Sequence, residues 1–158
     1  MSLLQFFGWV QGWRVGETIR GSLWMFPAIE SFHLLGLAVI GGAILLVDMR
    51  LFGLGMRGQP VRRLARDVQP WLTGGLVAML ISGALLFTSE PIKCYHISAF
   101  WVKMTFLPFA IAFTFTIRRK VTMADEQKIR PVWSKLVAIV SVALWSGVGI
   151  GGRWIGFS

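Results

Sequence analysis

Four long apolar stretches constrain the fold of this chain more than any other feature of its sequence. They occupy residues 23–48, 70–88, 98–117 and 134–152. Each is close to the roughly 20 residues that a helix needs to cross the hydrocarbon core of a bilayer. The chain has 158 residues, of which 55% are hydrophobic and only 15% charged, a more apolar composition than soluble domains have. The sequence therefore predicts an all-α integral membrane four-helix bundle that forms one domain over residues 1–158.

The segment before the first apolar stretch has a different pattern. From Leu3 to Arg20, large apolar and aromatic side chains alternate with polar ones. This pattern is typical of an amphipathic helix that lies in the membrane interface, and we expect such a helix over residues 1–20. The start of a long first membrane helix is the alternative. The segment lacks a basic n-region and a small-residue cleavage motif, so a cleaved signal peptide is not expected.

The basic residues cluster between the apolar stretches. Two connections hold eleven of the sixteen Lys and Arg residues: Arg50, Arg57, Arg62, Arg63 and Arg66 in the first, and Arg118, Arg119, Lys120, Lys128, Arg130 and Lys135 in the second. Cytoplasmic connections of membrane proteins carry such an excess. The sequence thus predicts a multi-pass protein of the bacterial inner membrane with both termini in the periplasm. Since topology accounts for the net charge of +9, we expect membrane lipid and no nucleic acid as a partner.

Small and polar residues in the stretches predict helix contacts. Gly74, Ala78 and Ser82 recur every four residues, as do Gly147 and Gly151, and such rows let helix backbones approach closely. Packing alone is a sufficient explanation for these rows, although a flat ligand also needs smooth walls. Asp48 lies two residues before Arg50, and we expect the two to form an interfacial charge pair.

Glu30 and His33 are ionisable residues inside the first apolar stretch, and the chain has only two histidines. A spacing of three places both on one face of a helix. Ionisable groups at membrane depth are costly, so a partner or a function should account for them. An imidazole there suits a heme iron, a copper ion or a proton relay.

Further polar residues fall at the same end of the bundle under the predicted topology. His96 and Lys103 lie seven residues apart, two turns on one helix face, and Arg153 is near the end of the fourth stretch. Heme b fits this set, because its iron binds a neutral imidazole and its propionates bind cations. We expect His33 to ligate iron, Lys103 and Arg153 to hold the propionates, and Glu30 to orient the imidazole or pair with a cation. His96 is a candidate second iron ligand.

Other interpretations of these residues stay open. His33, Cys94 and His96 offer nitrogen and sulfur ligands for copper or another small cation. A cofactor-free assembly or scaffold subunit is a further alternative, in which His33 bonds to a neighbouring helix and the cations reach the lipid headgroups. The single cysteine excludes an intrachain disulfide and a covalent Cys-x-x-Cys-His heme. The chain has no hydrolase or nucleotide-binding motif.

The sequence also resembles a family of small, uncharacterised bacterial four-helix membrane proteins. The resemblance rests on segments 30–36 (ESFHLLG), 46–53 (LVDMRLFG), 100–104 (FWVKM) and 151–156 (GGRWIG). A more distant likeness is to the HemJ-type protoporphyrinogen oxidases and to the copper-resistance D membrane domains. Both groups carry an early helix histidine and a later helix lysine, which correspond here to His33 and Lys103. The resemblance implies a heme or metal site around these two residues.

Together these observations predict a b-type heme-binding membrane protein. We expect it to serve in electron transfer or as the membrane subunit of a redox complex. A chain with so little mass outside the bilayer is expected to work in a homo-oligomer or in a larger redox complex.

Overall fold

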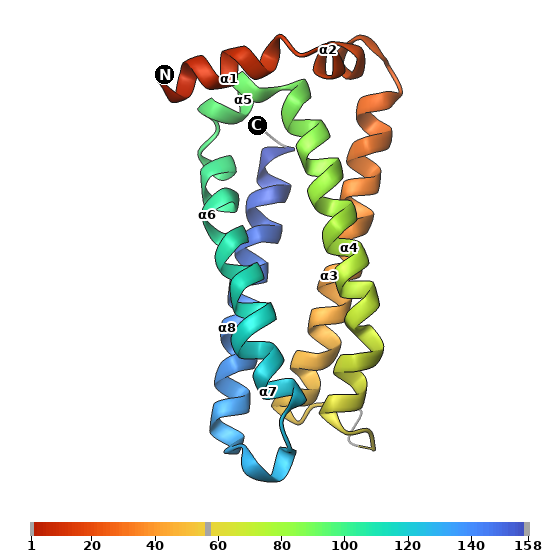
Figure 1. Cartoon of the computed structure of the whole chain (residues 1–158), viewed down its shortest axis with the longest axis vertical. Coiled ribbons are helices and arrows are strands. Elements are labelled where there is room, and N and C mark those ends of the chain that lie inside the picture. Colours follow the sequence, from red (N-terminus) through yellow and green to blue (C-terminus); the bar gives the residue numbers. More distant parts are fainter. Residues whose placement is uncertain (1, 56–57, 157–158) are drawn as a thin grey trace.

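The computed structural model describes residues 2–55 and 58–156, and this part of the chain is built from helices alone (Figure 1). Four long segments run side by side: α3 (Met25–Phe52), α4 (Val61–Ser89), the continuous α6 (Ser98–Phe113), η1 (Thr114–Arg118) and α7 (Arg119–Met123), and α8 (Pro131–Ile155). Among the described residues, these four are long and apolar enough to cross a membrane. The predicted all-α membrane bundle is confirmed.

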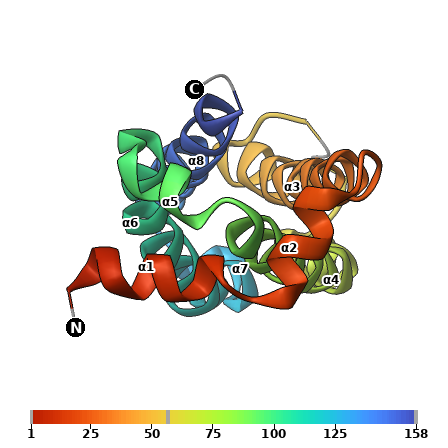
Figure 2. The same ribbon diagram turned by 90° about the horizontal axis from the view of Figure 1, so that it is seen from above.

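The two ends of the bundle differ. At one end, the loop end, short connections join α3 to α4 and α7 to α8, the latter containing the single turn η2 (Glu126–Lys128). At the other end, the cap end, α1 (Leu3–Gln11) and α2 (Arg14–Gly21) lie across the helices, beside α5 (Pro91–His96) (Figure 2). The basic connections of the sequence lie at the loop end, although Arg57 is outside the described residues.

The predicted interfacial helix over residues 1–20 is present as two helices, with Met1 outside the described part. Ser2 and Gln5 form a reciprocal capping box that starts α1, and the chain turns at Gly12 before α2 begins. Phe7 is buried against the bundle, whereas Trp9 is exposed where the membrane interface would lie. The alternative of one long first helix is therefore wrong.

Helix α2 is fixed to the end of α4. A Cβ atom on Gly16 would collide with the Thr88 carbonyl oxygen, so only glycine permits this approach. The guanidinium of Arg20 donates to the carbonyl oxygens of Ser89 and Gln11. Because the last carbonyls of a helix have no partner within it, Arg20 satisfies one at the end of α4.

The helices are longer than the apolar stretches. Helix α4 starts at Val61 rather than near residue 70, with Val61, Leu64 and Ala65 buried and the basic residues between them exposed. This i, i+3, i+4 spacing of buried residues is typical of an amphipathic helix, so the first turns of α4 are amphipathic and precede the apolar stretch. The apolar stretches therefore do not mark the ends of the helices, and Pro70 lies inside α4.

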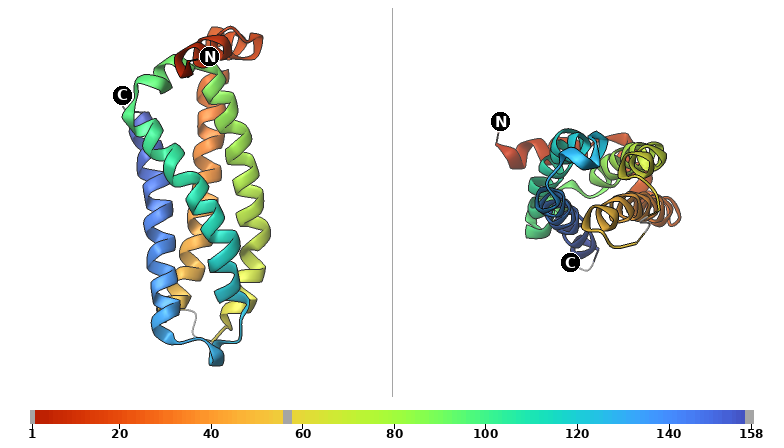
Figure 3. Two further views of the ribbon diagram at one scale, coloured as in Figure 1. Left: turned by 60° about the vertical axis from the view of Figure 1, so that its left-hand side comes forward. Right: turned by 90° about the horizontal axis from the view of Figure 1, so that it is seen from below.

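The four segments associate as two pairs, α3 with α4 and α6 with α8, and α3 also packs on α8 (Figure 3). Gly36 and Gly75 bring α3 and α4 together, since a Cβ on either would lie 3.3 Å from the carbonyl oxygen of the other. The predicted contact through Gly74 is wrong, because the space at its Cβ position is open. The predicted contacts at Gly147 and Gly151 are confirmed: they face Phe106 and Lys103 on α6.

A buried ion pair joins α3 to the third segment near the loop end. The Arg118 Nε donates to Asp48 Oδ1 at 2.9 Å, and its Nη2 donates to the Ile44 carbonyl at 3.2 Å. Arg118 ends the π-helical turn η1, and such a turn shifts the helix face that follows it. The expected Asp48–Arg50 pair is wrong: Arg50 Nε donates instead to the Gln59 carbonyl at 2.9 Å. Arg118, counted above as a loop cation, is buried inside the bundle.

Gly75→Leu should destabilise the bundle by about 1–3 kcal/mol, because the new side chain overpacks the α3–α4 contact. Gly74→Leu is the matched control, since its side chain would extend into open space. Thermal unfolding of both variants in detergent micelles measures the difference. Equal losses of stability would contradict the Gly36–Gly75 contact.

Arg118→Leu should cost about 3–5 kcal/mol, because it leaves the Asp48 carboxylate buried without its cation. The double variant Asp48→Leu with Arg118→Leu should recover much of that loss. Arg119→Leu, which changes an exposed neighbour, serves as the control in the same unfolding measurement. A double variant less stable than Arg118→Leu alone would contradict this account of the pair.

Candidate functional site

A cavity of about 590 Å³ lies in the cap-end half of the bundle. It is bounded by α3, α4, α5, α6 and the final turns of α8. Most of its wall is apolar, and its polar lining residues are Glu30, His33, Glu90, Lys93, Cys94 and Lys103. Its volume is within the roughly 300–1,000 Å³ of pockets that hold cofactors and small molecules.

His33 is buried in the wall of this cavity, and Ser82 on α4 holds its ring. The two residues are joined by a 3.0 Å hydrogen bond between His33 Nδ1 and Ser82 Oγ. The Ser82 hydroxyl donates its one hydrogen to the Ala78 carbonyl at 2.6 Å, so its oxygen accepts from the ring. These hydrogen bonds assign the proton to His33 Nδ1 and leave the lone pair of Nε2 as an acceptor.

Lys103 on α6 lies at the other side of the ring. Its Nζ is 3.1 Å from His33 Nε2 and donates a hydrogen bond to that lone pair. A chain of hydrogen bonds thus crosses the bundle from α4 through α3 to α6. The accepting nitrogen, His33 Nε2, is the ring atom that a metal ion would bind. Beside it lies the Lys103 ammonium, which is carried on a flexible four-carbon stem.

Glycines make room for both side chains. A Cβ on Gly83 would lie 3.1 Å from His33 Cε1, so the ring packs directly on the backbone of α4. On α8, the Cβ positions of Gly151 and Gly152 lie 3.3 Å from Lys103 Cβ and 3.5 Å from its Nζ. The Gly-Gly pair near the end of α8 therefore accommodates the lysine stem.

Aromatic rings close the cavity toward the cap end. Phe87 and Phe100 line it and stack with their centroids 5.7 Å apart. Phe7 of α1 contacts both edge-on, at 5.2 and 6.2 Å. Helix α1 thus packs, through Phe7, on aromatic residues of the cavity wall.

Cys94 is a further chemically distinctive group in the wall. Burial raises the pKa of its thiol above the ordinary value, and the negative charge of Glu90 adds to the rise. The thiol therefore stays protonated near neutral pH, which makes it a poor nucleophile.

The predicted site residues are brought together in part. Glu30, His33 and Lys103 line the same cavity, as expected. Arg153 is exposed near the end of α8, and it follows Gly152 of the cavity wall without lining the cavity itself. His96 is exposed on α5, where it contacts Tyr95, and it also does not line the cavity.

Two roles differ from those expected from the sequence. Ser82 and Lys103, not Glu30, hold the ring nitrogens of His33. Ser82 was visible in the sequence only as one of a row of small residues, because a serine in a membrane helix usually bonds to its own helix.

Within the described residues, no three His, Cys, Asp or Glu side chains form a group that could hold a metal ion.

The fold and the cavity define the class of this protein: a multi-pass helical membrane bundle with a buried histidine–lysine pair in the wall of a cavity. A family model described as "Family of unknown function (DUF6644)" matches residues 6–158, and the chain belongs to this family. No curated protein and no solved structure matches the chain. The likeness to HemJ-type oxidases and copper-resistance D domains accordingly gains no support from these comparisons.

Ser82→Ala should remove the acceptor that fixes the proton on His33 Nδ1, and the two neutral tautomers should then mix. The imidazole ¹⁵N chemical shifts report the tautomer directly, and His96→Gln leaves His33 as the only histidine for assignment. Ser82→Thr keeps a hydroxyl and should preserve the wild-type shifts. A wild-type spectrum with the proton on Nε2 would contradict the assigned hydrogen bonds.

Proposed function

We propose that this protein binds b-type heme in the cavity at the cap end, with His33 Nε2 as an iron ligand. One geometric feature carries the proposal: the hydrogen bonds of Ser82 assign the proton to Nδ1, so the Nε2 lone pair, which accepts from Lys103, is the one that iron would bind. Metal-ligating histidines commonly donate their other N–H in this way, which fixes ring orientation.

The cavity supports the fit of a porphyrin in several respects. Its volume is ample, its walls are mainly apolar, and Phe87 and Phe100 supply aromatic surface. The absence of side chains at Gly83 and Gly152 lets His33 and Lys103 pack directly on the helix backbones of the cavity wall. Lys103 would exchange its hydrogen bond to His33 for a propionate, a movement that its four-carbon stem permits. Arg153, near the membrane interface, remains the candidate for the other propionate.

Bound heme supplies one-electron chemistry through its iron. The protein would contribute a ligand of fixed tautomer through Ser82, a cation for the propionates through Lys103, and an apolar enclosure that excludes water. These contributions suit electron transfer, either by the protein itself or as the membrane subunit of a redox complex. A homo-oligomer or a larger complex would provide the electron donor and acceptor.

The second iron ligand is not assigned to His96 in this proposal, since that side chain is exposed outside the cavity. The copper alternative has less support, because His33 and Cys94 line the cavity whereas the exposed His96 does not. We also propose that the loop end faces the cytoplasm of a bacterial inner membrane, on the basis of the clustered Lys and Arg residues.

A cofactor-free assembly role is favoured by one specific observation. Both ring nitrogens of His33 already have hydrogen-bond partners, Ser82 and Lys103, so the site is satisfied without a ligand. In that case the histidine would tie three helices together, and its loss would change stability without removing any chromophore.

An ultraviolet–visible spectrum of the detergent-purified protein, oxidised and reduced, distinguishes the two functions. We expect a Soret band and reduced b-type bands, both lost in His33→Ala, because the iron loses its ligand. His96→Ala is the matched histidine control and should retain the Soret band. A purified protein without Soret absorbance, together with a His33→Ala variant that only unfolds more easily, would establish the cofactor-free role instead.

A further inference from the structure

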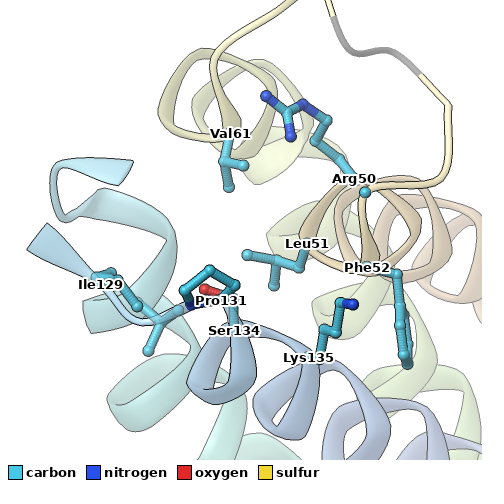
Figure 4. Close-up of a pocket in the computed structure, with 10 residues that line it drawn as sticks. Arg50, Leu51, Phe52, Val61, Ile129, Pro131, Ser134 and Lys135 are labelled. Carbon is cyan, nitrogen blue, oxygen red and sulfur yellow. The ribbon is translucent and has the colours of Figure 1, made fainter. Parts of the chain in front are cut away.

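A second pocket, of about 290 Å³, lies at the loop end of the bundle (Figure 4), whereas the cavity beside His33 lies in the cap-end half. It is formed by the end of α3, the start of α4, α7 and the start of α8. In Figure 4, Leu51 lies in the middle of the pocket, with Arg50 and Lys135 on either side of it. None of the proposed heme-site residues contributes to this pocket.

The polar part of this pocket is positively charged. Arg50 and Lys135 line it together with the Ser134 hydroxyl, and none of the described lining residues carries a carboxylate. The hydrogen bond from Arg50 Nε to the Gln59 carbonyl holds the guanidinium at the rim. Two cationic residues and a serine from two different helices therefore line one hollow.

The start of α8 adds to this field. Its first residue is Pro131, and Pro131, Ser134 and Lys135 all line the pocket. Over a helix of 25 residues, the peptide dipoles place a partial positive charge at this N-terminus. An anion in the pocket would thus interact with the two side-chain cations and with the helix end at once.

The remaining wall of the pocket is apolar. Leu51, Val61 and Val121 are buried, and Phe52 and Ile129 pack against the same core. Because α3 and α8 cross the membrane, their loop-side ends lie at the depth of the lipid headgroups. A pocket with a cationic rim and an apolar floor at that depth matches a molecule with an anionic head and a hydrocarbon chain.

We propose that this pocket binds the phosphate headgroup of an anionic phospholipid. The phosphate would lie between Arg50 and Lys135 near the first turn of α8, and the upper part of the acyl chains would contact Leu51 and Phe52. Basic pockets between membrane helices on the cytoplasmic side bind acidic headgroups by the same electrostatics. The apolar floor makes a lipid the source of the phosphate rather than the free ion.

Native mass spectrometry of the protein in neutral detergent, with phosphatidylglycerol and phosphatidylcholine in equal amounts, tests the proposal. We expect selective retention of phosphatidylglycerol. Lys135→Gln should weaken it roughly fivefold, the effect of one basic residue near an anionic headgroup. Arg50→Gln should act in the same direction, but it also removes the bond to Gln59, so the exposed Lys135 is the decisive position.

Lys120→Gln is the matched control, because this exposed lysine lies at the same end of the bundle outside the pocket. It should retain wild-type binding, whereas an equal loss in Lys120→Gln and Lys135→Gln would overturn the site in favour of diffuse attraction. Inorganic phosphate, added as a competitor, should displace the lipid only at far higher concentration, since it gains nothing from the apolar floor. Displacement at concentrations similar to the lipid's would overturn the lipid as the source of the phosphate.

Discussion

Inside a bilayer, a polar side chain must find its partner within the protein, and this constraint organises the whole bundle. Two polar clusters meet it. Ser82, His33 and Lys103 connect three helices in the cap-end half, and Asp48 with Arg118 connects two segments near the loop end. Between them lies an apolar core that includes Ile40, Leu76 and Trp145. The positions of the helices therefore depend on these few polar contacts as much as on the apolar surface that surrounds them.

The two clusters differ in how closely the helices pack around them. Around Asp48 and Arg118 the helices pack closely, which suits a structural ion pair. Around His33 and Lys103, glycines on α4 and α8 let the two side chains lie against the helix backbones, and a cavity lies beside them. The hydrogen bond between His33 and the flexible Lys103 can be exchanged for a bond to a ligand. Because Ser82 still holds the other ring nitrogen, the imidazole keeps its orientation. This is the physical basis for proposing a cofactor at His33 and a structural role for Arg118.

The sequence predicts the helices more readily than the contacts between them. The apolar stretches, the basic connections and the presence of helix before the first span follow from composition and periodicity, as does the grouping of Glu30, His33 and Lys103. The pairing of Asp48 with Arg118 does not follow from the sequence pattern. The two residues are 70 positions apart, and Arg118 lies at the end of the π-helical turn η1. Gly74 and Gly75 are neighbours in the sequence, and only the rotation of α4 decides which of them meets α3.

A hemin titration of the purified protein, followed by Soret absorbance, tests the central claim about His33 most directly. The account predicts saturation at one heme per chain for the wild type and no saturable binding for His33→Ala. It also predicts one-to-one but weaker binding for Lys103→Met, which keeps the ligand and loses the cation. Identical titration curves for the wild type and His33→Ala would contradict the account.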